Sequence, residues 1–163
     1  MYFTLSSSYA IKKKTTSGGD ETMYKVLLAT DGSDAALRGA RYLAQMAKTI
    51  PGIQVKVLHV IDPIHTLVVP EWLNPKEIEA QVEAHARGVM KRTLDVFREA
   101  GVEAESEILK GKPGELIAST AKNEGFNQIV MGAHGVSKLR GVTLGSVTQQ
   151  VLHLAECPVT IVK

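Results

Sequence analysis

The sequence lacks several features that mark whole classes of protein. Its 163 residues include a single cysteine, Cys157, so an internal disulfide is excluded. No apolar run approaches the roughly 18–20 residues of a membrane-spanning helix, and the N-terminus lacks the unbroken apolar core of a secretory signal. We therefore expect a cytoplasmic protein without a membrane span. Cys157 stands before Pro158 beside an apolar run, which indicates an inert, packed thiol.

Strong charge of one sign is also missing. The formal net charge at pH 7 is only +2, and the densest basic run, residues 12–14, is short. Nucleic acids and anionic membranes usually require a dense basic face on the proteins that bind them. We expect neither of them as the main partner.

Length and composition favour one domain. A hydrophobic fraction of 44% can fill a single core in a chain of this size. Residues 1–22 are rich in Ser, Thr and Gly and have no periodic apolar pattern, which predicts a disordered leader or an appended segment, with Met23 as an alternative start. Residues 23–163 are expected to form the folded domain.

From Tyr24 onward, short β-branched or aliphatic runs alternate with longer helical patterns. We predict strands at 25–30, 54–61, 103–109, 128–131 and 159–162, and helices at 34–49, 75–100, from 113 to about 124, and from about 144. Four of the strands are almost continuously apolar, as in strands covered on both faces, whereas the third alternates and is expected at an edge. The alternation predicts an α/β fold with a parallel sheet.

Helix ends and buried faces follow from local patterns. Ser33 is the expected N-cap of the first helix, Gly101 is placed to end the second, and Pro113 suits the first turn of the third. The apolar positions expected to be buried in the four helices are Ala36, Ala40, Leu43, Ala47 and Ile50, then Ile78, Val82, Ala86, Val89, Thr93 and Val96 or Phe97, then Leu116, Ile117, Thr120 and Ala121, and finally Val147, Val151, Leu152 and Ala155.

Right-handed crossovers restrict the order of five such strands. The simplest doubly wound arrangement has the order 3-2-1-4-5, with helices on both faces and a reversal between the first and fourth strands. Open parallel sheets bind ligands outside the carboxyl ends of their strands at that reversal. The arrangement places Thr30 and Asp31 next to Met131 and Gly132.

The stretch from Met131 to Thr148 sets glycines between an apolar strand and an amphipathic helix. Gly132, Gly135 and Gly145 allow backbone amides to approach a ligand, and a helix that begins near Ser146 offers unpaired N–H groups and a positive dipole end. Lys138 and Arg140 can offset phosphate charge. The pattern alone fits a phosphate site and an ordinary glycine turn with a capped helix equally well.

Standard phosphate motifs are absent from this stretch. The sequence has no Gly-Lys-Ser or Gly-Lys-Thr of a Walker A loop and no tight Gly-x-Gly turn of the dinucleotide fingerprint. Asp31, taken alone, is more typical of turn and helix-cap chemistry than of a ligand site. His134 shows no metal-ligand spacing with the other histidines, so we expect a loop residue and no zinc site.

A family resemblance favours the phosphate site. Gly132, two residues, Gly135, nine residues and then Gly145-Ser146 resembles the nucleotide-binding motif of the universal stress protein (UspA-like) family. The resemblance extends over residues 23–163, including residues 25–33, the Leu58-His59-Val60 run and residues 157–162. Some family members lack the glycine pattern and do not bind ATP, so its presence here implies the ATP-binding branch.

The resemblance implies a role for each matching position. Asp31 would lie against adenine and ribose with Ala29 and Thr30 beside it, Val60 would line the adenine pocket, and Met131 and Gly132 would lie by the sugar. The residues that would wrap or bind the phosphates are Gly135, Val136, Ser137, Lys138, Gly145, Ser146, Val147 and Thr148. Ala133 and His134 would belong to the same nucleotide site. Mg²⁺ would accompany ATP.

The sequence favours binding over catalysis. Fast phosphoryl transfer needs an organised metal, a base and charge stabilisation, and no evident base is aimed at a γ-phosphate. We expect a regulatory protein that acts through ATP occupancy in the stress response. The alternatives are slow ATP hydrolysis, an adenylate-forming enzyme, for which no His-x-x-His motif is present, and a dimer module that binds no nucleotide. The last strand would expose an apolar edge, which predicts a homodimer.

Overall fold

A computed structural model of the chain describes residues 23–63, 74–135 and 144–163. The strands in these ranges are β1 (Tyr24–Ala29), β2 (Ile53–Ile61), β3 (Ala104–Lys110), β4 (Gln128–Gly132) and β5 (Val159–Val162), and the helices are α1 (Asp34–Thr49), α2 (Pro75–Glu99), α3 (Pro113–Asn123) and α4 (Ser146–Leu154). Every predicted element is present, with its ends displaced by no more than one or two residues. The expected leader, residues 1–22, lies outside the described residues.

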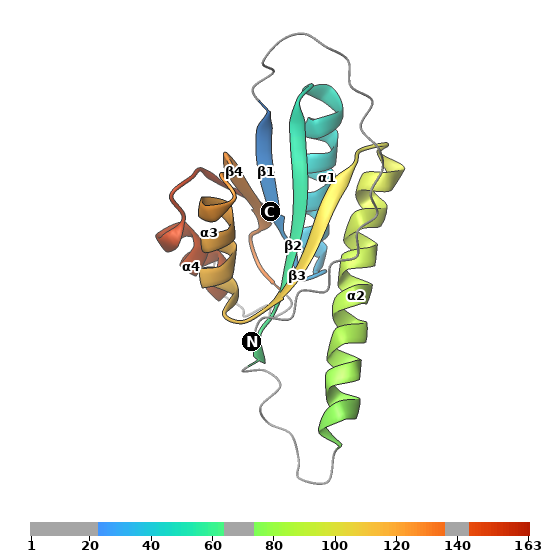
Figure 1. Ribbon diagram of the computed structural model, residues 1–163. Coiled ribbons are helices and arrows are strands. Elements are labelled where there is room, and N and C mark those ends of the chain that lie inside the picture. Colours follow the sequence, from blue (N-terminus) through green and yellow to red (C-terminus); the bar gives the residue numbers. More distant parts are fainter. Residues whose placement is uncertain (1–22, 64–73, 136–143) are drawn as a thin grey trace.

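The strands form one parallel sheet in the predicted order. Its order is β3-β2-β1-β4-β5, so β3 lies at an edge as its alternating pattern indicates, and β5 forms the other edge. The reversal falls between β1 and β4, where Ala29 is paired with Met131. All strands therefore end at the same edge of the sheet (Figure 1).

Helices cover both faces of the sheet, which gives two cores. On one face Leu28 packs with Leu43 of α1 and Phe97 of α2. On the other face Leu27 packs with Ile117 of α3 and with α4. Neighbouring residues of β1 thus point to opposite faces and are both fully buried, which explains why the strand is continuously apolar.

The predicted caps begin and end the helices. The Ser33 hydroxyl oxygen accepts a hydrogen bond from the Ala36 N–H at 3.2 Å, and Pro113 occupies the first turn of α3. Gly101 follows α2 with a φ of +71°, a conformation that favours glycine. Helix α4 begins at Ser146 rather than near Leu144, because Gly145 is its N-cap and has an extended backbone.

Two residues expected in the core are exposed. The Ile50 side chain is 49% exposed because α1 ends at Thr49 and the Ile50 backbone is already extended, so this residue leaves the buried stripe. Leu152 is 44% exposed. It follows the buried Val151 by one position, which is about 100° around the helix and turns the side chain to solvent.

The first half of α2 projects past the carboxyl edge of the sheet (Figure 1). For this reason Ile78 and Val82, which were expected in the core, are only half-buried, whereas Ala86, Val89 and Thr93 further along the helix are fully buried. The projecting half forms a wall beside the ends of the strands.

A cluster of three charges joins β2, β3 and the end of α3. The Lys56 ammonium, on a side chain that is 14% exposed, lies 2.7 Å from a carboxylate oxygen of Glu107 and 2.7 Å from one of Glu124. Burial alone lowers the pKa of Lys56, but hydrogen bonds to the two carboxylates outweigh it and the pKa is raised. Lys56 is the least exposed member of the cluster, whereas the Glu107 and Glu124 side chains are 28% and 42% exposed.

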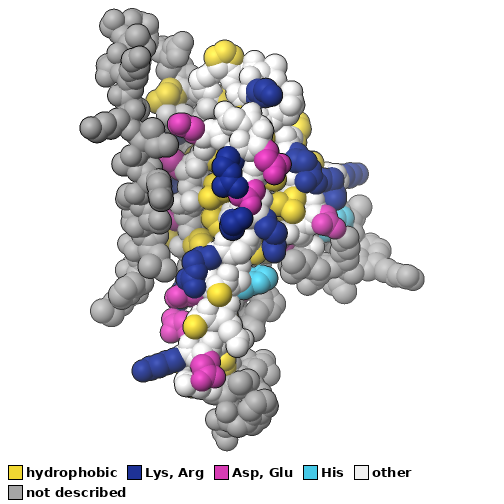
Figure 2. Space-filling view, turned by 90° about the vertical axis from the view of Figure 1, so that its right-hand side faces the viewer, with side chains coloured by type: hydrophobic (Ala, Val, Ile, Leu, Met, Phe, Trp, Pro, Cys, Tyr) yellow, Lys and Arg dark blue, Asp and Glu magenta, His cyan; other side chains and the backbone are white. Residues whose placement is uncertain are grey.

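We predict that Lys56→Met destabilises the fold by about 1–3 kcal/mol, since it leaves Glu107 and Glu124 facing each other without a cation. The measurement is urea unfolding near pH 7. Lys91→Met is the matched control. Its ammonium pairs with Asp95 on the outer face of α2, where positive and negative side chains are interspersed (Figure 2). That substitution should change stability by less than about 0.5 kcal/mol, and equal losses in the two variants would contradict the prediction.

Candidate functional site

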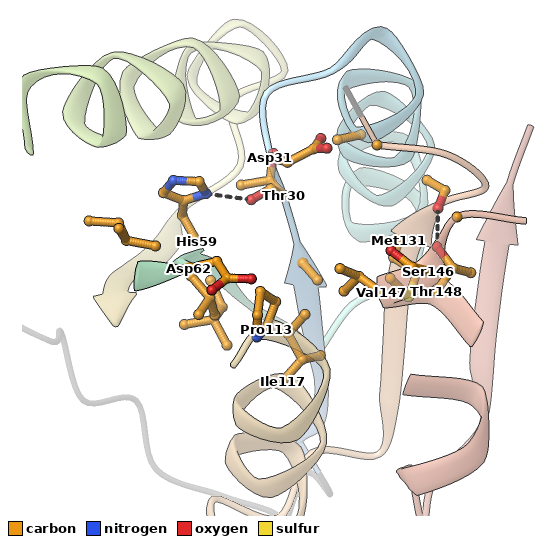
Figure 3. A pocket seen from close by; sticks show the side chains of 18 of the residues that line it. Thr30, Asp31, His59, Asp62, Pro113, Ile117, Met131, Ser146, Val147 and Thr148 are labelled. Carbon is orange, nitrogen blue, oxygen red and sulfur yellow. Dashed lines mark hydrogen bonds between the residues drawn. The ribbon is translucent and has the colours of Figure 1, made fainter. Parts of the chain in front are cut away.

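A cavity of about 600 Å³ opens at the carboxyl edge of the sheet, beside the reversal (Figure 3). The ends of β1, β2 and β4, the projecting half of α2 and the starts of α3 and α4 enclose it. The residues that line it are Ala29, Thr30, Asp31, Ala36, Leu58, His59, Val60, Ile61, Asp62, Gln81, Val82, His85, Pro113, Ile117, Met131, Gly132, His134, Gly135, Gly145, Ser146, Val147 and Thr148.

Asp31 sits in the turn between β1 and α1. One of its carboxylate oxygens accepts a hydrogen bond from the Ser33 N–H at 3.0 Å. The other lies against Gly135, where an added Cβ would come within 2.5 Å of it. The same Asp-Gly-Ser segment therefore serves the helix cap and also brings a carboxylate to the chain that leaves β4.

Each of the three glycines of the motif lies in close contact with neighbouring backbone or side-chain atoms. A Cβ on Gly132 would lie 2.7 Å from the carbonyl carbon of Ala35, so β4 ends directly against the first turn of α1. The Gly145 N–H donates to the carbonyl of Ala133 at 2.8 Å, which joins the two ends of the glycine segment. Among the described residues, no side chain caps α4, so within that part of the chain the first amides of the helix have no side-chain acceptor.

The Thr148 hydroxyl, which was expected to bind a phosphate, is bonded within the protein. The Thr148 side chain is 2% exposed, and its hydroxyl donates to the Gly132 carbonyl at 3.1 Å. Its proton is therefore used within the protein, and Thr148 ties α4 to β4 instead of offering that proton to a ligand. Ser146 remains exposed at the start of α4.

The side of the cavity nearest β2 carries His59. This side chain is 8% exposed, and its Nδ1 lies 2.8 Å from the Thr30 carbonyl (Figure 3). A carbonyl only accepts, so Nδ1 carries the proton and Nε2 is the free acceptor of the neutral ring. Burial lowers the pKa of His59 and His85 lowers it further, against the opposing effects of the Thr30 carbonyl and the Asp31 carboxylate.

Most of the predicted site residues surround this one cavity. Ala133 is buried and does not line the cavity. Val136, Ser137 and Lys138 fall outside the described residues, as does Arg140. The assignment of individual contacts to a ligand stays a prediction.

Sequence reasoning missed part of the lining. Asp62 directly follows β2, and that position at the carboxyl end of a central strand is a signal that points to it. Gln81 and His85 from α2 carry no such signal, because they reach the cavity only through the projection of that helix. Pro113 and Ile117 were expected as a helix start and a core position, and they also form one wall.

The described ranges 23–63, 74–135 and 144–163 contain neither a metal-binding cluster nor a membrane-spanning helix. No group of three or more His, Cys, Asp or Glu side chains in those ranges is arranged to hold a metal ion. No helix in the same part of the chain is both long and apolar enough to cross a bilayer.

Comparison with known proteins decides the family. Residues 23–163 match the model of the universal stress protein family. The chain belongs to this family.

Curated relatives support the assignment over nearly full length. Universal stress protein MJ0531 of Methanocaldococcus jannaschii is 28% identical over 163 residues, which is 100% of this chain and 95% of the relative. Universal stress protein YxiE of Bacillus subtilis is 32% identical over 85% of this chain and 98% of its own length.

Solved structures agree with the fold. The structure of MJ0577 from Methanocaldococcus jannaschii superposes with a TM-score of 0.74 at 31% identity and covers 86% of this chain and 95% of that chain. A universal stress protein from Archaeoglobus fulgidus in complex with dAMP has a TM-score of 0.61 at 26% identity and covers 86% of this chain and 98% of that chain.

His59 predicts a pH dependence of stability for this universal stress protein. Its pKa in the folded state lies below the ordinary value of 6.5, so the unfolded chain binds a proton more readily than the folded protein does. The contribution of neutral His59 to the free energy of unfolding is complete above pH 6.5 and is lost as the pH falls through the pKa of His59 in the folded protein. We expect the free energy of unfolding to decrease on acidification below pH 6.5, by at most about 1.4 kcal/mol per pH unit from this group.

The variant His59→Asn keeps a donor for the Thr30 carbonyl and does not titrate, so its unfolding free energy should depend less on pH in this window. His153→Asn removes an exposed histidine of α4 and is the control, with the wild-type dependence retained. Denaturant unfolding between pH 5 and 7.5 measures both. The same slope in His59→Asn and wild type would show that His59 is not its source.

Proposed function

We propose that this protein binds an adenine nucleotide, ATP together with Mg²⁺, in the cavity at the sheet reversal and acts in the stress response through occupancy. The observation that carries the proposal is the contact of Gly145 with Gly135 beside Asp31, at the start of α4, where no side-chain cap is found among the described residues. Backbone amides and a helix N-terminus are suited to phosphate, and glycine gives a ligand access to them.

The charge of the lining supports one orientation of the ligand. Among the described residues that line the cavity there are two carboxylates, Asp31 and Asp62, and no lysine or arginine. Phosphates therefore suit the glycine side with its free amides, and the neutral base suits the apolar side formed by Val60, Pro113 and Ile117. The dAMP complex of the Archaeoglobus fulgidus relative supports an adenine nucleotide as the ligand class.

Mg²⁺ fits the site as a companion of the nucleotide. The described residues form no metal site of their own, and the cavity places carboxylates near the region proposed for the phosphates. Asp31, or a water that it holds, would contact the ion. The ion would neutralise phosphate charge beside the carboxylates.

The proposal predicts that Gly145→Val abolishes nucleotide binding while the fold is kept. Gly145 has a φ of −67°, which valine tolerates, and a Cβ there would meet the Gly135 nitrogen at 3.4 Å, so the branched side chain fills the space between the glycine segment and α4. We expect at least a tenfold loss of ATP affinity in the presence of Mg²⁺, measured by isothermal titration calorimetry. Gly88→Val, in open space on α2, is the matched control and should bind as wild type does.

The same preparations separate the competing functions. Nucleotide released on denaturation of freshly purified protein is identified by mass spectrometry, and its absence together with no calorimetric binding would favour a dimer module with an empty site. Incubation with ATP and Mg²⁺ distinguishes occupancy from turnover. We expect hydrolysis well below the roughly 1 s⁻¹ at the lower end of the kinase range, and release of AMP and pyrophosphate would favour an adenylate-forming enzyme.

We also propose a homodimer that pairs the C-terminal strands. The carbonyls of Pro158 and Val162 accept hydrogen bonds from β4, so by the alternation of a strand the N–H and carbonyl of Ile161 face away from the sheet. This free edge is half-buried and apolar on its side chains, and such edges are usually paired. The cytoplasmic location, and the absence of nucleic acid and membrane partners, stay predictions of the sequence.

Ile161→Pro tests the edge directly. Proline removes the outward N–H and is tolerated on an edge strand where that group does not bond within the sheet. Ile161→Ala is the control, because it removes most of the side chain and keeps the N–H. Sedimentation velocity should show dimers for wild type and Ile161→Ala and monomers for Ile161→Pro. Dimers in all three would place the interface elsewhere.

A further inference from the structure

The turn that carries Asp31 rests on α2. Gly32 in this turn has a φ of +74°, and a Cβ on it would lie 2.8 Å from the Arg92 guanidinium and 3.0 Å from the Val89 side chain. The backbone of the turn is therefore in direct contact with the middle of that helix. The sequence did not predict this contact.

A line of hydrogen bonds crosses the same contact. The Gly32 N–H donates to the Thr30 hydroxyl oxygen at 3.2 Å, the Thr30 and Thr93 hydroxyls lie 3.1 Å apart, and the Thr93 hydroxyl donates to the Val89 carbonyl at 3.0 Å. Thr93 and Val89 are completely buried, and Thr30 is 6% exposed. Bulk water does not compete for these groups.

The direction of every bond in this line follows from proton counting. A threonine hydroxyl has one proton. Thr93 uses its proton on the Val89 carbonyl, so it can only accept from Thr30, and the Thr30 proton must point to Thr93. The line therefore runs from the Gly32 amide through both hydroxyls to the α2 backbone.

His59 holds the same turn from the other side. Its Nδ1–H donates to the Thr30 carbonyl, and the Thr30 N–H donates to the Leu58 carbonyl at 2.9 Å. The Thr30 backbone is thus fixed to β2, whereas its hydroxyl is fixed to α2. The Asp31 carboxylate, one residue further, has its position set by this doubly anchored residue.

We propose that Thr93, which does not line the cavity, is a positioning residue that places Asp31 through the Thr30 hydroxyl and thereby sets the affinity of the site. The inference rests on the proposed function for its binding readout. Without the Thr93 oxygen, the Thr30 hydroxyl is left buried with a proton and no acceptor, which favours rotation of Thr30 and release of the Gly32 amide. The turn then holds Asp31 less firmly against Gly135.

An ordinary structural role for Thr93 makes a different prediction. A buried helical threonine often bonds to the carbonyl four residues earlier and fills space with its methyl group. In that case the methyl group matters for packing, and the hydroxyl has no effect on the turn. Thr93→Val keeps the shape and removes the hydroxyl, whereas Thr93→Ser keeps the hydroxyl and removes the methyl, so the two variants separate these roles.

The experiment compares the full-length variants by calorimetric titration of ATP with Mg²⁺ and by amide hydrogen exchange of ligand-free protein. For Thr93→Val we expect about tenfold weaker binding and faster exchange of the Gly32 and Ser33 amides. Thr93→Ser should stay within about twofold of wild type in affinity and show wild-type exchange in the turn, even where its melting temperature is lower. Thermal unfolding reports on the global stability of each variant.

Thr30→Val removes the donor of the same bond and completes a double-mutant cycle. If the two hydroxyls act through one line of hydrogen bonds, Thr30→Val and Thr93→Val speed up exchange of the same amides. The double variant then shows little more loss of amide protection than either single variant. Additive effects, wild-type exchange in Thr93→Val, or equal losses in Thr93→Ser and Thr93→Val would each overturn the inference. Wild-type protein that binds no nucleotide would refute the proposed function alone, because the exchange measurements still decide the role of Thr93.

Discussion

The site at the sheet edge depends on how closely α1 approaches the strands. Its inner face carries Ala35, Ala36, Gly39 and Ala40, all buried and all small. A Cβ on Gly132 would collide with the Ala35 backbone, so β4 ends against the first turn of α1 with no side chain between them. The chain after β4 consequently passes the Asp31 carboxylate at Gly135 instead of being held away from β1. A doubly wound sheet allows a crevice at its reversal. Here the small residues of α1 and the glycines that follow β4 form it.

Around this crevice, hydrogen bonds to the backbone hold the polar side chains in place. Asp31 is fixed by the Ser33 amide, His59 by the Thr30 carbonyl and Thr148 by the Gly132 carbonyl. These bonds orient the side chains before any ligand arrives, which reduces the ordering cost of binding. They also consume the protons that threonine or the Nδ1 of histidine would otherwise offer. The groups left for an anion are mainly the backbone amides at the start of α4, and those are fixed by the helix itself.

The sequence predicts the fold well because its signals are local. Ser33, Pro113 and Gly101 determine helix ends within a few residues, and right-handed crossovers then leave few strand orders. Burial on short or terminal turns depends on tertiary packing, which is why the predictions for Ile50 and Leu152 are wrong. The strand ends and glycines of the candidate site follow from the same local signals. Gln81 and His85 line the cavity only because α2 extends past the sheet, and no local sequence pattern predicts how far it extends. The Thr148 hydroxyl donates to the Gly132 carbonyl, and no local pattern predicts where that carbonyl lies.

The charge of the cavity supports the proposal that the protein binds a nucleotide without rapid phosphoryl transfer. Rapid transfer depends on cations held in place to stabilise the oxygens that gain negative charge. In the described part of the chain the lining supplies carboxylates at Asp31 and Asp62 and histidines, but no lysine or arginine. Within the described residues, a phosphate group there would depend on amide dipoles and on a divalent ion that arrives with it, and Lys138 and Arg140 lie outside those residues. This composition supports the proposal that the protein registers a nucleotide by occupancy instead of consuming it.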